Sequence, residues 1–230
     1  MPSTITPPFT RTNPFYHASA LQFGAPPFDR IHDEDYAPAI EEGMRQHLQE
    51  VAAIASQTAA PTFENTIVAL ERSGDLLTRV LKTFGWVTSA NTNDTLQAVQ
   101  TEESPKLAAH SDAIFLDDKL FQRVRQIYDR RDQLGLSPEQ KHLVERYHLD
   151  FVRAGAKLSE ADKTRLRALN QEESKLTNDF QNRLLAATKA AALVFDDRAE
   201  LEGLSEADIA AAAEAATERK LPGKWVLRLQ

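Results

Sequence analysis

The sequence predicts an all-α fold: a multi-helix bundle of about six or seven helices with a minor β-strand pair near the carboxyl end. Three observations support this fold class. Apolar residues recur at alternating steps of four and three along much of the chain, which places them on one face of a helix. Ser, Asn and Asp precede several of these runs, at positions where they cap helices. Two short segments near the carboxyl end are instead rich in strand formers.

Residues 1–30 are expected to form an irregular amino-terminal arm, and residues 31–230 a helical domain. Prolines interrupt the arm, and we expect it to be packed by Phe15, Phe23 and Phe28. The arm has no apolar run of signal-peptide length, and no segment of the chain approaches the roughly 18 apolar residues of a membrane span. Together with the absence of cysteine, these features favour a cytoplasmic location and no membrane partner.

The first helix is expected over residues 33–57, before Pro61. The run that starts at Pro61 is the most strongly patterned in the chain. Gly74 lies within its apolar stripe and costs a helix about 1 kcal/mol relative to Ala, so we expect another helix to cross closely there. A second stripe makes this helix apolar on two sides and therefore central to the bundle. The two stripes consist of Phe63, Ile67, Leu70, Gly74, Leu77, Leu81 and Phe84, and of Leu76, Val80 and Val87.

A polar break at residues 91–94 separates this helix from the next. Asn93 or Thr92 is well suited to cap the helix that follows. That helix meets Pro105, which we expect to kink or restart it, because proline lacks the backbone N–H that the helix interior needs.

A further helix is expected over residues 118–134, and Gly135 ends it. The sharpest boundary in the chain comes next: Ser137 caps the following helix, Pro138 takes its first turn, and Gln140 can close a capping box.

One long helix is expected from Ser159 to about Ala191, a length that a bundle can use, and Ser205 starts another. Ala192–Phe195 and Trp225–Gln230 are short apolar segments, and we expect them to pair as strands that lean on the helix from Ser159. Their outer edge is expected to be open and to make the chain prone to self-association. One face of the long helix carries Leu166, Leu169, Leu176, Phe180, Leu184 and Ala187.

The net charge of −7 disfavours generic binding to nucleic acid, which usually needs a basic excess. The local basic cluster, interspersed with acidic residues, is predicted to be a solvated helix face: Arg123, Arg125, Arg130 and Arg131. Neighbouring residues on a helix point apart, so we interpret three adjacent acidic pairs as caps and solvated groups rather than general acids or bases: Glu102 with Glu103, Asp117 with Asp118, and Asp196 with Asp197.

The histidines do not form a recognisable metal-binding pattern. His142 and Glu145 share a helical face, but His148 lies about 240° around the helix from His142, so three ligands cannot converge from that helix alone. No two of the six histidines are four residues apart: His17, His32, His47, His110, His142 and His148. We therefore expect no catalytic, cofactor-binding or metal-binding residue in this chain.

Several motifs nevertheless resemble one family. The run Pro61–Val80, with Ala25–Asp29 before it and Ser89–Asn93 after it, resembles the amino-terminal region of the thimet oligopeptidase family of zinc metallopeptidases. Within that family, its sequence is most similar to the bacterial peptidyl-dipeptidases. The resemblance covers about residues 13–230. Further matches are Pro105–Ile114, Lys119–Arg123, Leu184–Thr188 and Gly223–Leu227.

The resemblance implies an enzyme whose active site is not in this chain. The family binds zinc with His-Glu-x-x-His and a downstream glutamate, and no such motif occurs here. We expect the chain to be the amino-terminal part of a longer enzyme, which holds zinc and removes dipeptides from the carboxyl end of short peptides. The chain would form one wall of the substrate channel, have the catalytic domain as its partner, and be inactive alone. The alternative is a non-catalytic helical module for protein interactions.

Overall fold

The computed structural model describes residues 8–227 and confirms the all-α fold class, with one two-stranded sheet near the carboxyl end. The chain divides into two compact units, with the boundary between Leu176 and Thr177. The first unit holds six helices and the start of a seventh. These are α1 (Tyr36–Ala55), α2 (Ala69–Arg72), α3 (Asp75–Asn91), α4 (Asp94–Phe115), α5 (Asp118–Arg130), α6 (Pro138–Arg153) and α7 (Glu160–Ala190).

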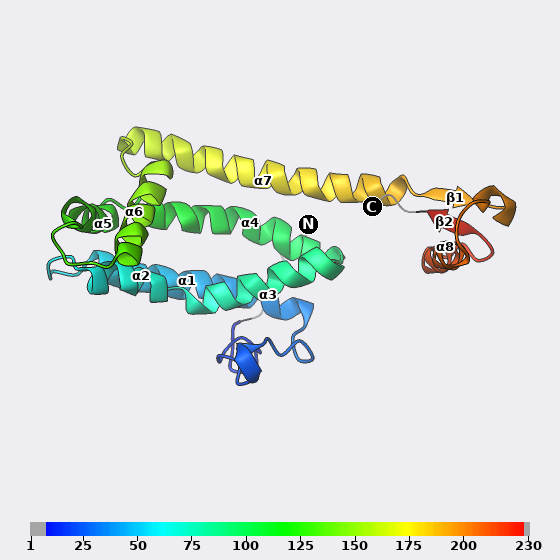
Figure 1. Cartoon of the computed structure of the whole chain (residues 1–230), viewed down its shortest axis with the longest axis horizontal. Coiled ribbons are helices and arrows are strands. Elements are labelled where there is room, and N and C mark those ends of the chain that lie inside the picture. Colours follow the sequence, from blue (N-terminus) through cyan, green and yellow to red (C-terminus); the bar gives the residue numbers. More distant parts are fainter. Residues whose placement is uncertain (1–7, 228–230) are drawn as a thin grey trace. The chain divides into compact units, whose positions relative to one another are not determined.

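Helices α1, α3 and α4 form the body of the first unit. Helix α1 packs against both α3 and α4, and Figure 1 shows the three running side by side. Helices α5 and α6 pack on each other at one end of α1. Two apolar clusters fill the interior. One joins the carboxyl half of α1 to α5 and α6 through Val51, Ile54, Leu120, Val124, Ile127 and Phe151. The other joins α1 to α3 through Ile40, Met44, Leu77, Val80 and Phe84.

Gly74 is not inside a helix, so the prediction of one continuous helix after Pro61 was wrong. A π-type turn (Phe63–Val68) and α2 come first, and Gly74, with φ of 72°, separates α2 from α3. The predicted close approach is real, because a Cβ on Gly74 would lie 2.8 Å from His47 Nδ1. The backbones of α1 and α3 meet at Gly43, where a Cβ would lie 2.9 Å from the Cα of Leu77.

The polar residues that cap the amino-terminal ends of three helices are those that the sequence predicts. The Asn93 side chain accepts a hydrogen bond from the backbone of the first turn of α4, and Ser137 and Gln140 form the capping box of α6. Ser205 caps α8 (Glu206–Glu218). Pro105 does not restart its helix, because α4 continues through it as one element.

The second unit contains the predicted strand pair. Strands β1 (Leu193–Phe195) and β2 (Trp225–Leu227) are antiparallel, with Val194 opposite Val226. Arg228–Gln230, which we also expected in the strand, lie outside the described residues. The supporting helix was predicted wrongly: Val226 packs on Ala215 and Ala216 of α8, whose small side chains let the sheet approach closely.

The aromatic residues of the arm do not all pack as expected. Phe15 is buried beside Tyr36, whereas Phe28 is half exposed and the side chain of Phe23 is 98% exposed. Phe23 also adopts a φ of 59°, which is unfavourable for a residue with a Cβ. The arm is therefore held by Phe15 and leaves its other two phenylalanines in contact with solvent.

Candidate functional site

Two of the six histidines, the buried His110 and the half-buried His47, form a pair between α1 and α4. His47 Nδ1 lies 3.0 Å from His110 Nε2, and His47 Nε2 lies 3.2 Å from the Ser73 hydroxyl, which itself donates to the carbonyl of Leu70. This network assigns the protons: His47 donates through Nε2 to Ser73, so His47 Nδ1 accepts from His110 Nε2. Both rings are then neutral, and the remaining nitrogen of His110, Nδ1, is buried without a partner.

Burial makes this pair hard to protonate. It lowers the pKa of His110 to about 4, with a smaller contribution from the neighbouring His47, and it also lowers the pKa of His47. The facing nitrogens are occupied by each other, so the pair is arranged for packing α1 on α4 rather than for binding a metal ion.

The side chains of His142, Glu145 and His148 on α6 do not converge on one site. His142 is exposed, and the other two contact different residues. Glu145 accepts a 2.9 Å hydrogen bond from Arg131, whose guanidinium also lies over the ring of Tyr128. His148 stacks on Tyr128 with ring centroids 3.8 Å apart. These contacts attach α6 to the end of α5.

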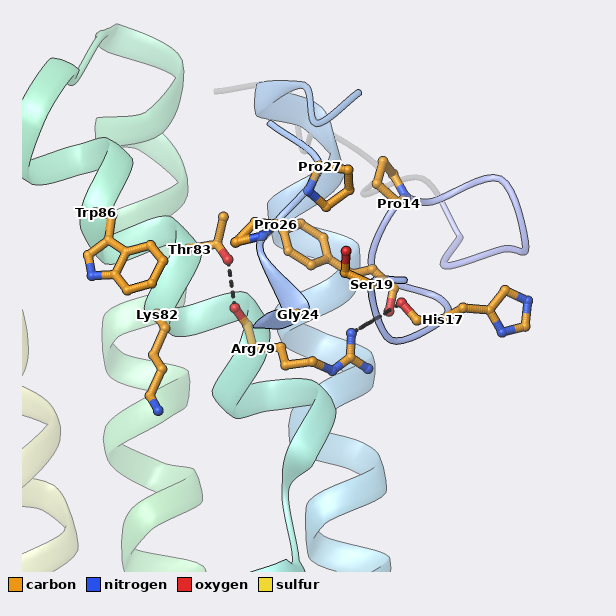
Figure 2. Close-up of a pocket in the computed structure, with 11 residues that line it drawn as sticks. Pro14, His17, Ser19, Gly24, Pro26, Pro27, Arg79, Lys82, Thr83 and Trp86 are labelled. Atoms are coloured by element: carbon orange, nitrogen blue, oxygen red, sulfur yellow. Dashed lines mark hydrogen bonds between the residues drawn. The ribbon is translucent and has the colours of Figure 1, made fainter. Parts of the chain in front are cut away.

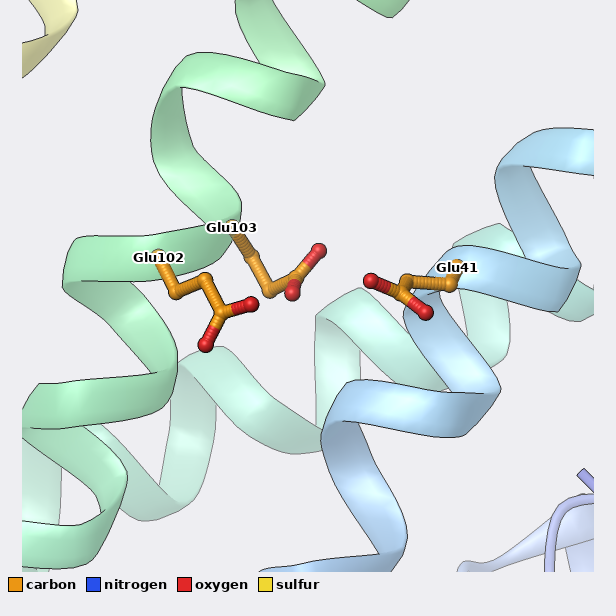
Figure 3. A group of neighbouring side chains, drawn as sticks. All are labelled: Glu41, Glu102 and Glu103. Carbon is orange, nitrogen blue, oxygen red and sulfur yellow. The ribbon is translucent and has the colours of Figure 1, made fainter. Parts of the chain in front are cut away.

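Three carboxylates meet between α1 and α4 (Figure 3). Glu41, Glu102 and Glu103 each place an oxygen within 4.8 Å of the others, and all three bind the ammonium of Lys106, at 2.5, 3.0 and 2.8 Å respectively. Glu103 was predicted wrongly as a solvated group: it is only 1% exposed, and burial raises the pKa of its carboxyl. The second carboxylate oxygen of Glu103 is buried without a hydrogen-bond partner.

The zinc that the resemblance implies does not fit this cluster. Catalytic zinc in peptidases of the His-Glu-x-x-His type needs two imidazoles and a carboxylate around an open position, whereas the cluster offers carboxylates alone and Lys106 lies among them. It is the only group of three or more such ligands within residues 8–227. No catalytic step is therefore derived from the residues that the structure describes.

Arg123 was also predicted wrongly as part of a solvated face. It is buried on α5, where its guanidinium donates to the carbonyls of Gln57 and Ala59 and to the side chains of Asn65 and Thr66. Burial lowers the pKa of this guanidinium. Arg123 therefore fastens the connection between α1 and α2 to α5. The sequence held a signal for this role, because Arg123 is three residues after Leu120 and four before Ile127, on the apolar face.

A pocket of about 120 Å³ lies between the arm and α3 (Figure 2). The arm supplies the loop from Pro14 to Pro27, and α3 supplies Arg79, Thr83 and Trp86. The sequence alone does not predict this pocket, because the pocket depends on how the irregular arm folds back onto α3.

An apolar stripe on α7 is exposed instead of packed in a bundle. The side chain of Phe180 is 66% exposed, and its neighbours on this face are half exposed or more. Such a stripe is unusual on the surface of an isolated soluble domain and is typical of a docking face. The exposed members are Leu169, Leu176, Phe180 and Leu184.

Among residues 8–227, no helix is long and apolar enough to cross a membrane. No family model matches the chain.

Comparison with curated proteins identifies clear relatives. The chain is 49% identical over 220 residues to a dipeptidyl carboxypeptidase of Escherichia coli, an alignment that covers 96% of the chain and 32% of that protein. It is 47% identical to the dipeptidyl carboxypeptidase of Salmonella typhimurium, over 95% of the chain and 32% of that protein. An oligopeptidase A of Escherichia coli is 27% identical over 87% of the chain and 30% of that protein. The chain thus spans about a third of the length of these relatives. The resemblance predicted from the motifs is confirmed, and the chain is a relative of the dipeptidyl carboxypeptidases and, at lower identity, of oligopeptidase A.

Proposed function

We propose that this chain is the amino-terminal, helical channel-wall portion of a zinc-dependent peptidyl-dipeptidase, which removes dipeptides from the carboxyl end of short peptides. The observation that carries the proposal is the 49% identity to a dipeptidyl carboxypeptidase, which extends over 96% of the chain. The match covers 32% of that protein, so about two thirds of the relative lies outside the match and is long enough to contain a catalytic domain.

The exposed stripe on α7 supports a role as one part of a larger protein. Leaving Leu176, Phe180 and Leu184 in water forgoes the roughly 1.5–3 kcal/mol that burial of each such side chain provides. A catalytic domain that covers the stripe would recover this free energy. We therefore assign the stripe as the face on which the catalytic domain docks.

The side chains of this chain indicate which roles the catalytic domain would have to supply. In the whole enzyme, zinc would polarise the peptide carbonyl and activate a water molecule. The catalytic domain would supply the zinc ligands and the general base, since the described part of this chain offers no fitting set. This chain would narrow the entrance so that short peptides pass and folded proteins do not. The absence of cysteine in its sequence is in keeping with a cytoplasmic enzyme.

A second candidate is a non-catalytic helical module for protein interactions. The α7 stripe would serve such a module equally well, so the fold alone does not separate the two functions. The coding sequence beyond Gln230 separates them: a His-Glu-x-x-His run favours the peptidase, and a stop codon favours the module.

Docking can be tested with part of a relative of this chain. The chain would be mixed with the remaining two thirds of the Escherichia coli dipeptidyl carboxypeptidase, and the mass of the complex measured by light scattering. We expect a one-to-one complex that the double variant Phe180→Ser, Leu184→Ser weakens about tenfold or more. Gln171→Ser, on the opposite face of α7, should leave it unchanged. Absence of a complex, or self-association of the chain in its place, would contradict the proposal.

A further inference from the structure

The pocket between the arm and α3 is built from residues that the proposed function does not use. Its walls are largely apolar, because Pro14, Phe15, Pro26 and Pro27 of the arm and Trp86 of α3 line it. Prolines and a buried phenylalanine give these walls little freedom to collapse. At about 120 Å³ the pocket is slightly smaller than an engineered apolar cavity of about 150 Å³ that binds benzene, so it has room for one aliphatic side chain.

The arm holds the pocket open by polar contacts to α3. Arg79 donates to the carbonyls of Phe15 and His17, at 3.2 and 3.3 Å, and its Nε pairs with Asp75 at 2.9 Å. Ser19 donates to the carbonyl of Ala25 at 2.6 Å and thereby closes the loop on itself. The pocket is therefore a formed feature of the fold rather than a gap between loose segments.

Lys82 gives the rim of the pocket a positive charge. Arg79 and Lys82 lie one turn apart on α3, and both line the pocket, as Figure 2 shows. Lys82 is exposed, and Asp75 is the acidic partner of Arg79. Because Asp75 offsets the charge of Arg79, the positive charge that remains at the rim is that of Lys82, and it favours a ligand with a carboxylate.

One exposed aromatic side chain lines the pocket. This side chain belongs to Trp86, which is 58% exposed. Aromatic side chains around a pocket are the usual anchors of a peptide interface.

We propose that this pocket binds an extended peptide segment that inserts one aliphatic side chain and places a neighbouring acidic side chain against Lys82. Trp86 would cover the inserted side chain. The inference goes beyond the proposed function and does not depend on it, because the pocket lies wholly within this chain and far in sequence from the α7 stripe.

The probe is a fluorescein-labelled pentapeptide, Ala-Glu-Leu-Glu-Ala, labelled at its amino end and amidated at its carboxyl end. Blocking both ends removes any contribution from a free carboxyl terminus. We expect saturable binding by fluorescence anisotropy. Replacing the peptide's leucine by alanine should weaken binding about tenfold, and replacing both glutamates by glutamine about two- to fivefold at low salt.

Variants of the chain locate the site. Trp86→Ala should weaken binding about tenfold, and Lys82→Gln about two- to fivefold, with the loss from Lys82→Gln vanishing for the glutamine peptide. Lys119→Gln, an exposed lysine on α5 with the same change in charge, should have no effect. Circular dichroism of each variant checks that it is folded. The proposal is overturned if the peptide shows no saturable binding, if the glutamine peptide binds equally well, or if Trp86→Ala and Lys82→Gln bind like the unaltered chain.

Discussion

His47 on α1 and His110 on α4 face each other across the first unit, with Nδ1 and Nε2 3.0 Å apart. The side chain of His110 is only 8% exposed, and the pair stays neutral because a charge on either ring would be buried. The contact joins α1 to α4 through two residues that are 63 positions apart in the sequence. Protonation of either ring would therefore disturb the packing of α1 against α4.

The first prediction is that this pair makes the chain sensitive to mild acid. The pKa of His110 is lowered to about 4, whereas an unfolded histidine titrates near 6.5. Between these values the unfolded chain binds more protons than the folded one. The free energy of unfolding should therefore be highest above pH 6.5 and should fall as the pH drops towards 4. At about 1.4 kcal/mol per pKa unit, His110 accounts for a decrease of up to about 3 kcal/mol.

Urea unfolding between pH 7 and pH 5 measures this effect, since most carboxylates remain ionised there. His110→Gln should flatten the pH dependence, while His142→Gln, at an exposed position on α6, should keep it. An unaltered slope in His110→Gln would show that the acid sensitivity has another source.

The second prediction concerns Lys106 as the counter-ion of Glu103. Burial raises the pKa of the Glu103 carboxyl, and Lys106 opposes this rise. Lys106→Met leaves the buried carboxylate unpaired and should destabilise the chain by about 3–5 kcal/mol at pH 7. A raised folded pKa means that the folded state binds the proton more tightly, so the loss should be smaller at pH 5 than at pH 7.

Thermal unfolding at both pH values provides the measurement. The double variant Glu103→Gln, Lys106→Met should recover part of the lost stability and lose the difference between pH 5 and pH 7, because it removes the unpaired charge. A Lys106→Met chain that is equally stable at both pH values would contradict this assignment.

The third prediction contrasts two glycines. Gly74→Ala forces a Cβ at a φ of 72° and within 2.8 Å of His47 Nδ1, so it should destabilise the chain by more than about 2 kcal/mol. Gly85→Ala adds a Cβ where no atom lies within 4 Å, inside α3, and should stabilise the chain by about 0.5–1 kcal/mol. Chemical unfolding of the two variants measures these changes in the free energy of unfolding. Equal changes in the two variants would argue against a left-handed conformation at Gly74.

The sequence predicted features that depend on neighbouring residues. The capping box of Ser137 and Gln140 and the Asn93 cap are read from local spacing, and the structure has them. The caps Asp117 and Asp197 belong to the same class. The pairing of the two strands is a predicted contact between distant segments that the structure has, and it was predicted because the composition of each segment is typical of a strand.

Several other features that depend on contacts between distant segments were missed. The apolar spacing around Gly74 is the same in one helix as in two helices joined by a left-handed residue, so the pattern could not show the break. Arg123 and Glu103 are buried because partners from other elements reach them, Gln57 and Ala59 in one case and Glu41 through Lys106 in the other. The arm pocket was missed for the same reason, since Arg79 binds carbonyls 62 and 64 residues away.

The fourth prediction is that the isolated chain holds no stoichiometric zinc. The facing nitrogens of His47 and His110 are paired with each other, and the Glu41 cluster already surrounds an ammonium. Elemental analysis after dialysis against zinc at neutral pH tests this expectation. One zinc retained per chain would require a ligand set that the present side-chain arrangement does not provide.

The most direct test of the account is peptide hydrolysis by the reconstituted enzyme. The chain, the remaining two thirds of the Escherichia coli dipeptidyl carboxypeptidase and zinc would be combined, and release of a dipeptide from an amino-blocked tripeptide followed with time. We predict that neither polypeptide alone releases the dipeptide and that the mixture does, with loss of turnover in the Phe180→Ser, Leu184→Ser variant. Dipeptide release by the chain alone, or a stable complex without turnover, would contradict the account.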